Sequence, residues 1–167
     1  MSSHLVHIAA WMYRQVLRHL RRLRPSLLLC VVGANASAAP IDCSQALQLE
    51  SDHLGVLLFD LGDAKLRLDS KRRAIAIFKQ LEAANLGGYR QVLLVGHADQ
   101  LGDDKTNLEL SRRRVVEVKK HLPQGVLTSV DVQEVYCGQS NPLVPRKGER
   151  EHPHNRRVEI RLRSNPF

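Results

Sequence analysis

The sequence VLLVGHADQLGDDKTNLELSRRRVVEVKKHL, residues 92–122, predicts a strand, a loop and a helix in succession. Val92–Val95 is an apolar run without polar alternation, which is typical of a strand buried on both faces. The loop Gly96–Gly102 follows it. We predict a helix from about Thr106 to Leu122, where Pro123 ends it. Its apolar stripe comprises Leu108, Val115, Val118 and Leu122.

The flanking segments continue this alternation of strand and helix. We predict strands over 55–60 and 130–136, and a helix over roughly 70–85 that Asp69 or Ser70 caps. In the last strand, 156–163, apolar and charged residues alternate, which indicates one packed and one solvent-facing side. The order β-α-β-α-β-β predicts an α+β two-layer sandwich, with helices on one face of a small mixed sheet and polar residues on the other.

The formal charge of +8 is concentrated near the N-terminus. Residues 1–39 contain five arginines and no acidic residue, so residues 40–167 hold 20 basic and 17 acidic residues, a net charge of +3. Only 4% of the chain is aromatic. Nucleic-acid-binding domains carry their own basic surface, often with interleaved aromatic side chains, so this class is excluded.

The first 39 residues have the order of a secretory signal peptide. A positive segment, Arg14–Arg24, precedes an apolar segment, Leu27–Gly33, and small residues with A-x-A spacing follow at 36–38. The apolar run over 27–39 has 13 residues, fewer than the ~20 that a membrane-spanning helix needs. We expect residues 1–39 to be removed on export; the alternative is an amphipathic surface helix. Residues 40–54 are interpreted as a lead-in to one domain over 55–167.

Removal of the signal peptide would also remove Cys30, which leaves two cysteines, Cys43 and Cys137. Export places them in an oxidising compartment, where a disulfide is permitted. The bond depends on a Cα separation that a sequence does not supply. The pair therefore stays open between a disulfide and two free thiols.

Three separated motifs resemble the OmpA-like peptidoglycan-binding family. Gly96–Gly102 matches its G-H-T-D-x-x-G motif, and Asn107–Val115 matches N-x-x-L-S-x-x-R-A without a gap. Asn155–Ile160 matches N-R-R-V-E-I and follows an Asn-Pro dipeptide at 141–142. The resemblance covers about residues 55–163. It implies the family's fold and a non-catalytic function in the periplasm, the binding of diaminopimelate in the peptide stem of peptidoglycan.

Diaminopimelate presents an ammonium group beside a carboxylate, so its binder needs an anion and a cation. Asp99 can accept from the ammonium group, and Arg114 can bind the carboxylate through two parallel N–H bonds. Asn107 lies seven residues before Arg114 and therefore shares its helix face. The resemblance also implies a second cation, Arg157, on the outer face of the last strand. We predict these four side chains as the ligand-binding residues.

Some positions depart from the family pattern or have simpler interpretations. Ala98 replaces a threonine, and the loop after Pro142 carries Arg146 and then Glu151-His152 where the family has an asparagine and a Gly-Arg pair. His97 is predicted to be a structural, hydrogen-bonding histidine. His152 and His154 are too few to form a metal site, so we expect no metal and no cofactor.

Taken singly, the candidate residues fit ordinary structural roles. Asp99 can cap a turn, Asn107 can cap the helix, and Arg112–Arg114 can be a solvated face. The leading hypothesis remains a periplasmic module that binds peptidoglycan, with envelope proteins as further partners. An alternative is a structural subunit of an envelope complex, such as a motor or secretion system, whose wall site has decayed. An enzyme is disfavoured because no cysteine–histidine or serine–histidine arrangement is present in the motifs.

Overall fold

The computed structural model describes residues 41–83, 89–145 and 151–164, except for the side chains of residues 89 and 90. The predicted signal peptide and Arg146 lie outside these ranges. The elements are α2 (Cys43–Gln48), β1 (Asp52–Leu58), α3 (Leu68–Ala83), β2 (Tyr89–Gly96), α4 (Asp104–Lys120), α5 (Gln124–Ser129), β3 (Asp131–Tyr136), the 3-10 turn η2 (Pro153–Asn155) and β4 (Arg157–Ser164). Within these ranges, no helix is both long enough and apolar enough to cross a membrane.

The strands form a four-stranded mixed sheet in the order β1-β4-β2-β3. β4 pairs antiparallel with both β1 and β2, and β2 pairs parallel with β3. Parallel neighbours need a crossover connection, which α4 and α5 supply. The predicted α+β class and the order β-α-β-α-β-β are confirmed, while α2 and α5 are additional helices that the sequence pattern did not predict.

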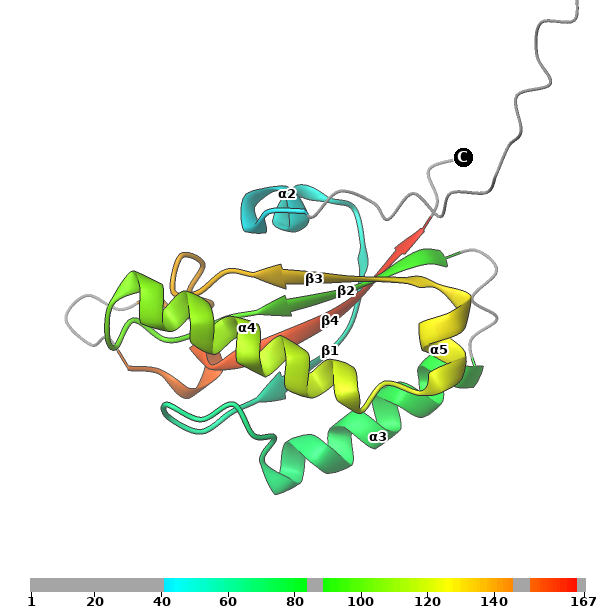
Figure 1. The fold of residues 1–167 in the computed structure, drawn as a ribbon, viewed down its shortest axis with the longest axis horizontal. Coiled ribbons are helices and arrows are strands. Elements are labelled where there is room, and N and C mark those ends of the chain that lie inside the picture. The colour runs from blue at the N-terminus through cyan, green and yellow to red at the C-terminus, as the bar shows by residue number, and fades with distance from the viewer. Residues whose placement is uncertain (1–40, 84–88, 146–150, 165–167) are drawn as a thin grey trace, which may run out of the picture. The chain divides into compact units, whose positions relative to one another are not determined.

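The helices α3 and α4 cover one face of the sheet, the lower face in Figure 1. The core on this face includes Leu57, Ile77, Leu81, Leu94, Val115, Val118, Val158 and Ile160. Leu108 was predicted to join it, but its side chain is 49% exposed. This residue lies in the first turns of α4, which extend past the strand ends in Figure 1, so its side chain does not lie over the sheet. Leu110 is the buried leucine of this part of the helix.

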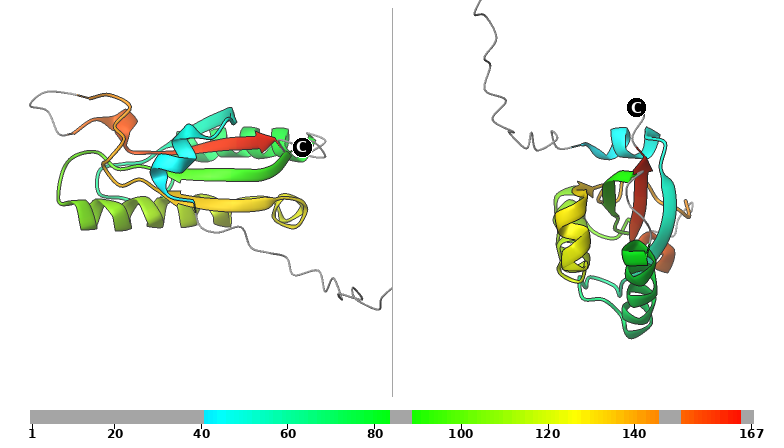
Figure 2. Two further views of the ribbon diagram at one scale, coloured as in Figure 1. Left: turned by 90° about the horizontal axis from the view of Figure 1, so that it is seen from above. Right: turned by 90° about the vertical axis from the view of Figure 1, so that its right-hand side faces the viewer.

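The opposite face of the sheet is not polar throughout, contrary to the prediction. Leu93, Val95 and Val135 form a second apolar cluster there, and α2 packs over it. Figure 1 and Figure 2 both show α2 on the side of the sheet away from α3 and α4. A disulfide joins Cys43, the first residue of α2, to Cys137 directly after β3, with a Cα–Cα distance of 5.1 Å.

The segment 40–54 therefore contains more structure than its sequence suggested. α2 begins after Asp42, whose side chain accepts a hydrogen bond from the Gln45 backbone N–H, while the Gln45 side chain accepts from the Asp42 N–H. This reciprocal arrangement is a capping box, which satisfies two amide donors at a helix start. A helix of six residues is not stable alone, so the cap, the disulfide and the apolar cluster together hold α2 in place.

The boundaries of the predicted elements shift by a few residues. β1 covers Asp52–Leu58 instead of 55–60, and α3 covers Leu68–Ala83 instead of 70–85. Ser70 does not cap α3; its hydroxyl bonds both the N–H and the carbonyl of Leu58, and so ties α3 to the end of β1. α4 begins at Asp104, ahead of the predicted start, because the Asp103 side chain caps it by accepting from the Thr106 N–H at 2.8 Å.

Gly96, at the end of β2, lets α4 approach the sheet closely. A Cβ atom at this position would lie 2.6 Å from the Ser111 carbonyl oxygen and 2.6 Å from Val115 Cγ2. Real Cβ atoms do not approach other atoms so closely, so any larger residue would push the helix away. The contact places Arg114, the residue before Val115, directly beside the loop that follows β2.

Candidate functional site

The candidate site lies at one end of the sheet, on the left in Figure 1. The loops that follow β1 and β2 meet there with the connection that leads from β3 through η2 to β4. Three of the four predicted ligand-binding residues, Asp99, Asn107 and Arg114, lie at this end and are buried. The fourth, Arg157, lies at the same end but on the other face of the sheet.

Arg114 is a fully buried arginine that binds backbone carbonyls. Its Nε donates to the Asp63 carbonyl at 2.9 Å, Nη1 to the His97 carbonyl at 2.9 Å, and Nη2 to the Asp60 carbonyl at 3.0 Å. Its guanidinium also lies 5.2 Å from the centre of the Phe59 ring, within cation–π range. The side chain therefore connects the loop after β1 to the loop after β2, a structural task that the sequence did not reveal.

Arg114 stays positively charged although it is buried. Desolvation lowers its pKa to about 10, while the negative charge of Asp99 acts in the opposite direction and the positive charge of Arg156 in the same direction. A pKa near 10 keeps the guanidinium positive at neutral pH. Asp99, Arg114 and Arg156 are thus electrostatically coupled, with one carboxylate between two cations.

Asp99 forms an ion pair with Arg156, the residue immediately before β4. The carboxylate is 2% exposed, and its Oδ2 accepts from Arg156 Nη1 at 3.1 Å. The same Nη1 donates to Glu151 Oε1 at 3.1 Å, and Arg156 Nε donates to the Phe59 carbonyl at 3.3 Å. Arg156 therefore anchors the connection into β4 against both the loop after β1 and the candidate anion.

Arg157 lies on the other face of the sheet, so the cation beside Asp99 is Arg156. Arg157 binds Glu159 at 2.7 Å, and both side chains are buried, although this side of β4 was predicted to face solvent. Strand residues alternate between faces, so Arg156 shares a face with Val158, which packs under the helices. The candidate site is on that helix side. The spacing of each arginine from Val158 in the N-R-R-V motif, two residues or one, therefore distinguishes the two arginines.

Asn107 positions loops and does not cap α4. Its Nδ2 donates to the Leu101 carbonyl at 3.0 Å and to Gln139 Oε1 at 2.9 Å. Gln139 in turn donates to the carboxylate of Asp104. The residue thus ties the loop after β2 to the loop after β3, which fixes the segment that carries Asp99.

Sequence comparison with known proteins finds distant relatives. No family model matches the chain. It is 29% identical over 107 residues to outer membrane protein A of Bordetella avium, a match that covers 62% of this chain and 52% of that protein. It is 26% identical over 129 residues to the peptidoglycan-associated lipoprotein of Pseudomonas aeruginosa, with 77% of this chain and 73% of that protein covered. The chain thus spans about half the length of the first of these relatives.

Solved structures agree on the fold. The peptidoglycan-associated lipoprotein from Burkholderia pseudomallei matches with a TM-score of 0.53 and 18% identity, over 65% of this chain and 89% of that one. The cell wall anchor of the T6SS from Pseudomonas aeruginosa matches with a TM-score of 0.51 and 23% identity, over 65% and 76%. The chain has an OmpA-like fold. The recognition made from the three sequence motifs is therefore confirmed.

The departures of this OmpA-like domain from the family motifs have visible consequences. Ala98, in place of threonine, is buried, and its N–H donates to the Gly138 carbonyl at 2.7 Å, so the loop keeps its backbone anchor. Glu151 supplies the second carboxylate on Arg156. His152 accepts at Nδ1 from the His154 N–H and so caps η2. In the described ranges no group of three or more side chains could hold a metal ion.

His97 lies on the α2 side of the OmpA-like sheet, in a cluster of buried charges. Its ring is fully buried, and in contrast to the prediction neither ring nitrogen hydrogen-bonds to a described residue. Nε2 lies 3.5 Å from Glu159 Oε1. Burial lowers the pKa of His97 to about 3; the positive charges of Arg157 and Arg161 add to this and Glu159 opposes it. The ring is therefore neutral at physiological pH.

The low pKa of His97 predicts a loss of stability in weak acid. Below about pH 6.5 the histidine is protonated in the unfolded state but stays neutral in the folded state until about pH 3. Protonation therefore stabilises the unfolded state relative to the folded state as the pH falls. Between pH 7 and pH 5 this effect lowers the free energy of unfolding by about 2 kcal/mol. Urea unfolding of wild type and His97→Gln at both values measures it. Between these pH values the free energy of unfolding should fall less in His97→Gln than in wild type, by that amount. An equal fall in the two proteins would refute the prediction.

Proposed function

We propose that this domain binds peptidoglycan without covalent chemistry, by holding the diaminopimelate of the peptide stem between Asp99 and Arg114. The observation that carries the proposal is the meeting of a buried carboxylate and a buried, charged guanidinium at one end of the sheet. An amino-acid head group has the complementary pair of charges. The relatives named for outer membrane protein A and for peptidoglycan association support the same function.

The hydrogen-bonding capacity of Arg114 supports its role as the carboxylate ligand. A guanidinium has five N–H donors, and three of those on Arg114 bind backbone carbonyls, which leaves two. Because the carbonyl bonds hold the group rigidly, these two donors are preorganised. Asp99 accepts from the ligand ammonium group, and Arg156 replaces the predicted Arg157 as the second cation. Asn107 positions the loop and does not contact the ligand in this proposal.

The alternative role, as a structural subunit of an envelope complex, uses the same fold. The likeness to the cell wall anchor of the T6SS fits it but is a likeness of fold. Both roles place the domain in the cell envelope. Export to the periplasm with removal of residues 1–39 stays a prediction, because these residues lie outside the described ranges.

Asp99→Asn tests the proposal because it removes the charge and keeps the shape. A hydrogen bond to a charged group contributes about 1.5–3 kcal/mol, so binding to purified sacculi should weaken about 10- to 150-fold. Co-sedimentation in the presence of a chelator measures it. Asp69→Asn is the matched control, since Asp69 is an exposed carboxylate on α3. Equal loss in both variants would show that the attraction is not specific to the site.

The identity of the ligand is tested with a second kind of wall. A lysine side chain in the peptide stem ends in an ammonium group without the neighbouring carboxylate. Sacculi that contain lysine instead of diaminopimelate should therefore bind weakly, because Arg114 has no partner. Equally strong binding of both walls would contradict diaminopimelate as the ligand, although the domain could still be a wall-binding module.

A further inference from the structure

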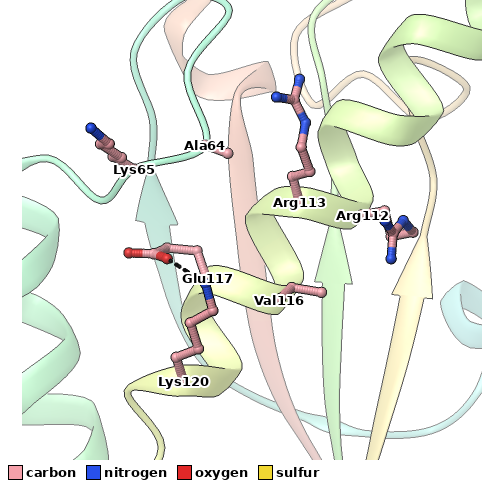
Figure 3. Close-up of a pocket in the computed structure, with 7 residues that line it drawn as sticks. All are labelled: Ala64, Lys65, Arg112, Arg113, Val116, Glu117 and Lys120. Carbon is pink, nitrogen blue, oxygen red and sulfur yellow. Dashed lines mark ion pairs between the residues drawn. The ribbon is translucent and has the colours of Figure 1, made fainter.

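A pocket of about 250 Å³ lies outside the candidate site, between α4 and the loop that leads from β1 to α3. Figure 3 shows Lys65 on the loop side and Arg113 on the helix side of this pocket. Ala64, Val116, Glu117 and Lys120 complete the lining. Arg112 stands at its edge, but Figure 3 shows it turned to the other side of α4, and it is bound to Glu109 at 2.9 Å.

The charges of this pocket do not cancel. Lys120 Nζ lies 3.5 Å from Glu117 Oε2, so these two side chains compensate each other. Lys65 and Arg113 form no ion pair with any described residue. This loop has two acids: Asp60 pairs with Arg67, and Asp63 accepts at Oδ1 from the Lys65 backbone N–H. The pocket therefore keeps an excess of positive charge that suits an anion.

The pocket adjoins the candidate site through the chain itself. The Asp63 carbonyl accepts a hydrogen bond from Arg114 Nε, and Ala64 and Lys65 are the next two residues of the loop. On the helix, Arg113 directly precedes Arg114. The loop and the helix that form the candidate site thus continue into this pocket, and Arg114 holds the two together.

We propose that this pocket is a second subsite, which binds another carboxylate of the peptide stem whose diaminopimelate lies at Asp99 and Arg114. The inference rests on the proposed function and extends it from a single amino-acid head to a longer piece of the peptide. The small size of the pocket favours this ligand over an acidic protein. A protein partner would cover about 800 Å² of surface, whereas this pocket has room for roughly one amino-acid side chain. A stem peptide carries further free carboxylates, on its glutamate and at its C-terminus.

The test compares three probes on the full chain: free diaminopimelate, the stem tetrapeptide, and a dipeptide of alanine and γ-linked glutamate that lacks diaminopimelate. In Lys65→Ala/Arg113→Ala, tetrapeptide affinity should fall about three- to tenfold, as expected for two solvent-exposed ion pairs, and the affinity for free diaminopimelate should stay unchanged. The control is Lys71→Ala/Lys79→Ala, which removes the same charge from exposed positions on α3. It should bind both probes as wild type does.

The dipeptide separates this inference from the proposed function. It should shift the amide resonances of Ala64 and Val116 in wild type and in Asp99→Asn, but not in Lys65→Ala/Arg113→Ala. That result supports the subsite even if free diaminopimelate fails to bind. The subsite is wrong if the dipeptide shifts neither resonance, or if both double variants weaken tetrapeptide binding equally. Free diaminopimelate that binds wild type but not Asp99→Asn would then still support the proposed function.

Discussion

Replacement of Arg114 by alanine is expected to lower the free energy of unfolding by about 3–5 kcal/mol. The substitution removes the hydrogen-bond donors of three carbonyls, those of Asp60, Asp63 and His97, which lie around a fully buried side chain. A buried polar group left without a partner, here the His97 carbonyl, costs about 1–3 kcal/mol; the part-buried carbonyls of Asp60 and Asp63 and the vacated space add to this. Urea unfolding at pH 7 measures the effect.

Arg112→Ala is the control for this prediction. It removes the same side chain from the same helix, but Arg112 is half exposed and, among the described residues, its side chain binds Glu109 alone, so its loss should cost less than about 1 kcal/mol. Equal destabilisation by the two substitutions would show that the carbonyl contacts of Arg114 do not hold the loops. Arg114→Lys should fall between them, because one ammonium group cannot reproduce the planar fork that reaches three carbonyls.

This double role changes how a binding experiment on Arg114 is interpreted. Loss of wall binding in Arg114→Ala follows equally from a lost ligand contact and from displaced loops. Asp99→Asn disturbs the loops less, because its amide oxygen can still accept from Arg156, which keeps Glu151 as a charge partner. Binding data on Arg114 variants therefore need the unfolding curve of the same protein beside them.

Removal of the disulfide is expected to cost about 4–5 kcal/mol in the chain-entropy model, because the bond closes a long loop. Cys43 and Cys137 are 94 residues apart in sequence. Without the bond, α2 has only its cap and a small apolar cluster to hold it, so Leu93 and Val95 should become accessible to a hydrophobic dye. Cys43→Ala/Cys137→Ala in urea unfolding measures the loss, and Gln48→Ala, an exposed position in α2, is the control.

Thiol titration of the denatured, unreduced exported protein checks the bond directly. Once residues 1–39 are removed, two cysteines remain, so the bonded protein should show no reactive thiol. Two reactive thiols would contradict the disulfide. Unchanged stability of the double variant, with no reactive thiol in wild type, would show that the bond forms but does not stabilise the fold.

The sequence by itself determined the longer elements of the fold and their order. Strand and helix patterns are local, since a period of two or of 3.6 residues appears in any window that one element occupies. The spacing of the motifs also brought Asp99 and Arg114 to the same site, because a loop directly after a buried strand and a helix packed over that strand must meet. The short helices α2 and α5 were not predicted, because six residues are too few to show a helical period.

Only the tertiary structure decided which groups meet across distant segments. Arg156 and Arg157 are neighbours with the same chemistry, and the side of the sheet on which the site lies determines which of them reaches Asp99. The three carbonyls on Arg114 belong to loops 17 to 54 residues away, so no local pattern predicts them. Likewise, the cysteines permitted a disulfide, but the Cα separation of 5.1 Å arises only when α2 packs against the end of β3. Contacts of this kind depend on how whole elements pack, and packing is not a property of any one stretch of sequence.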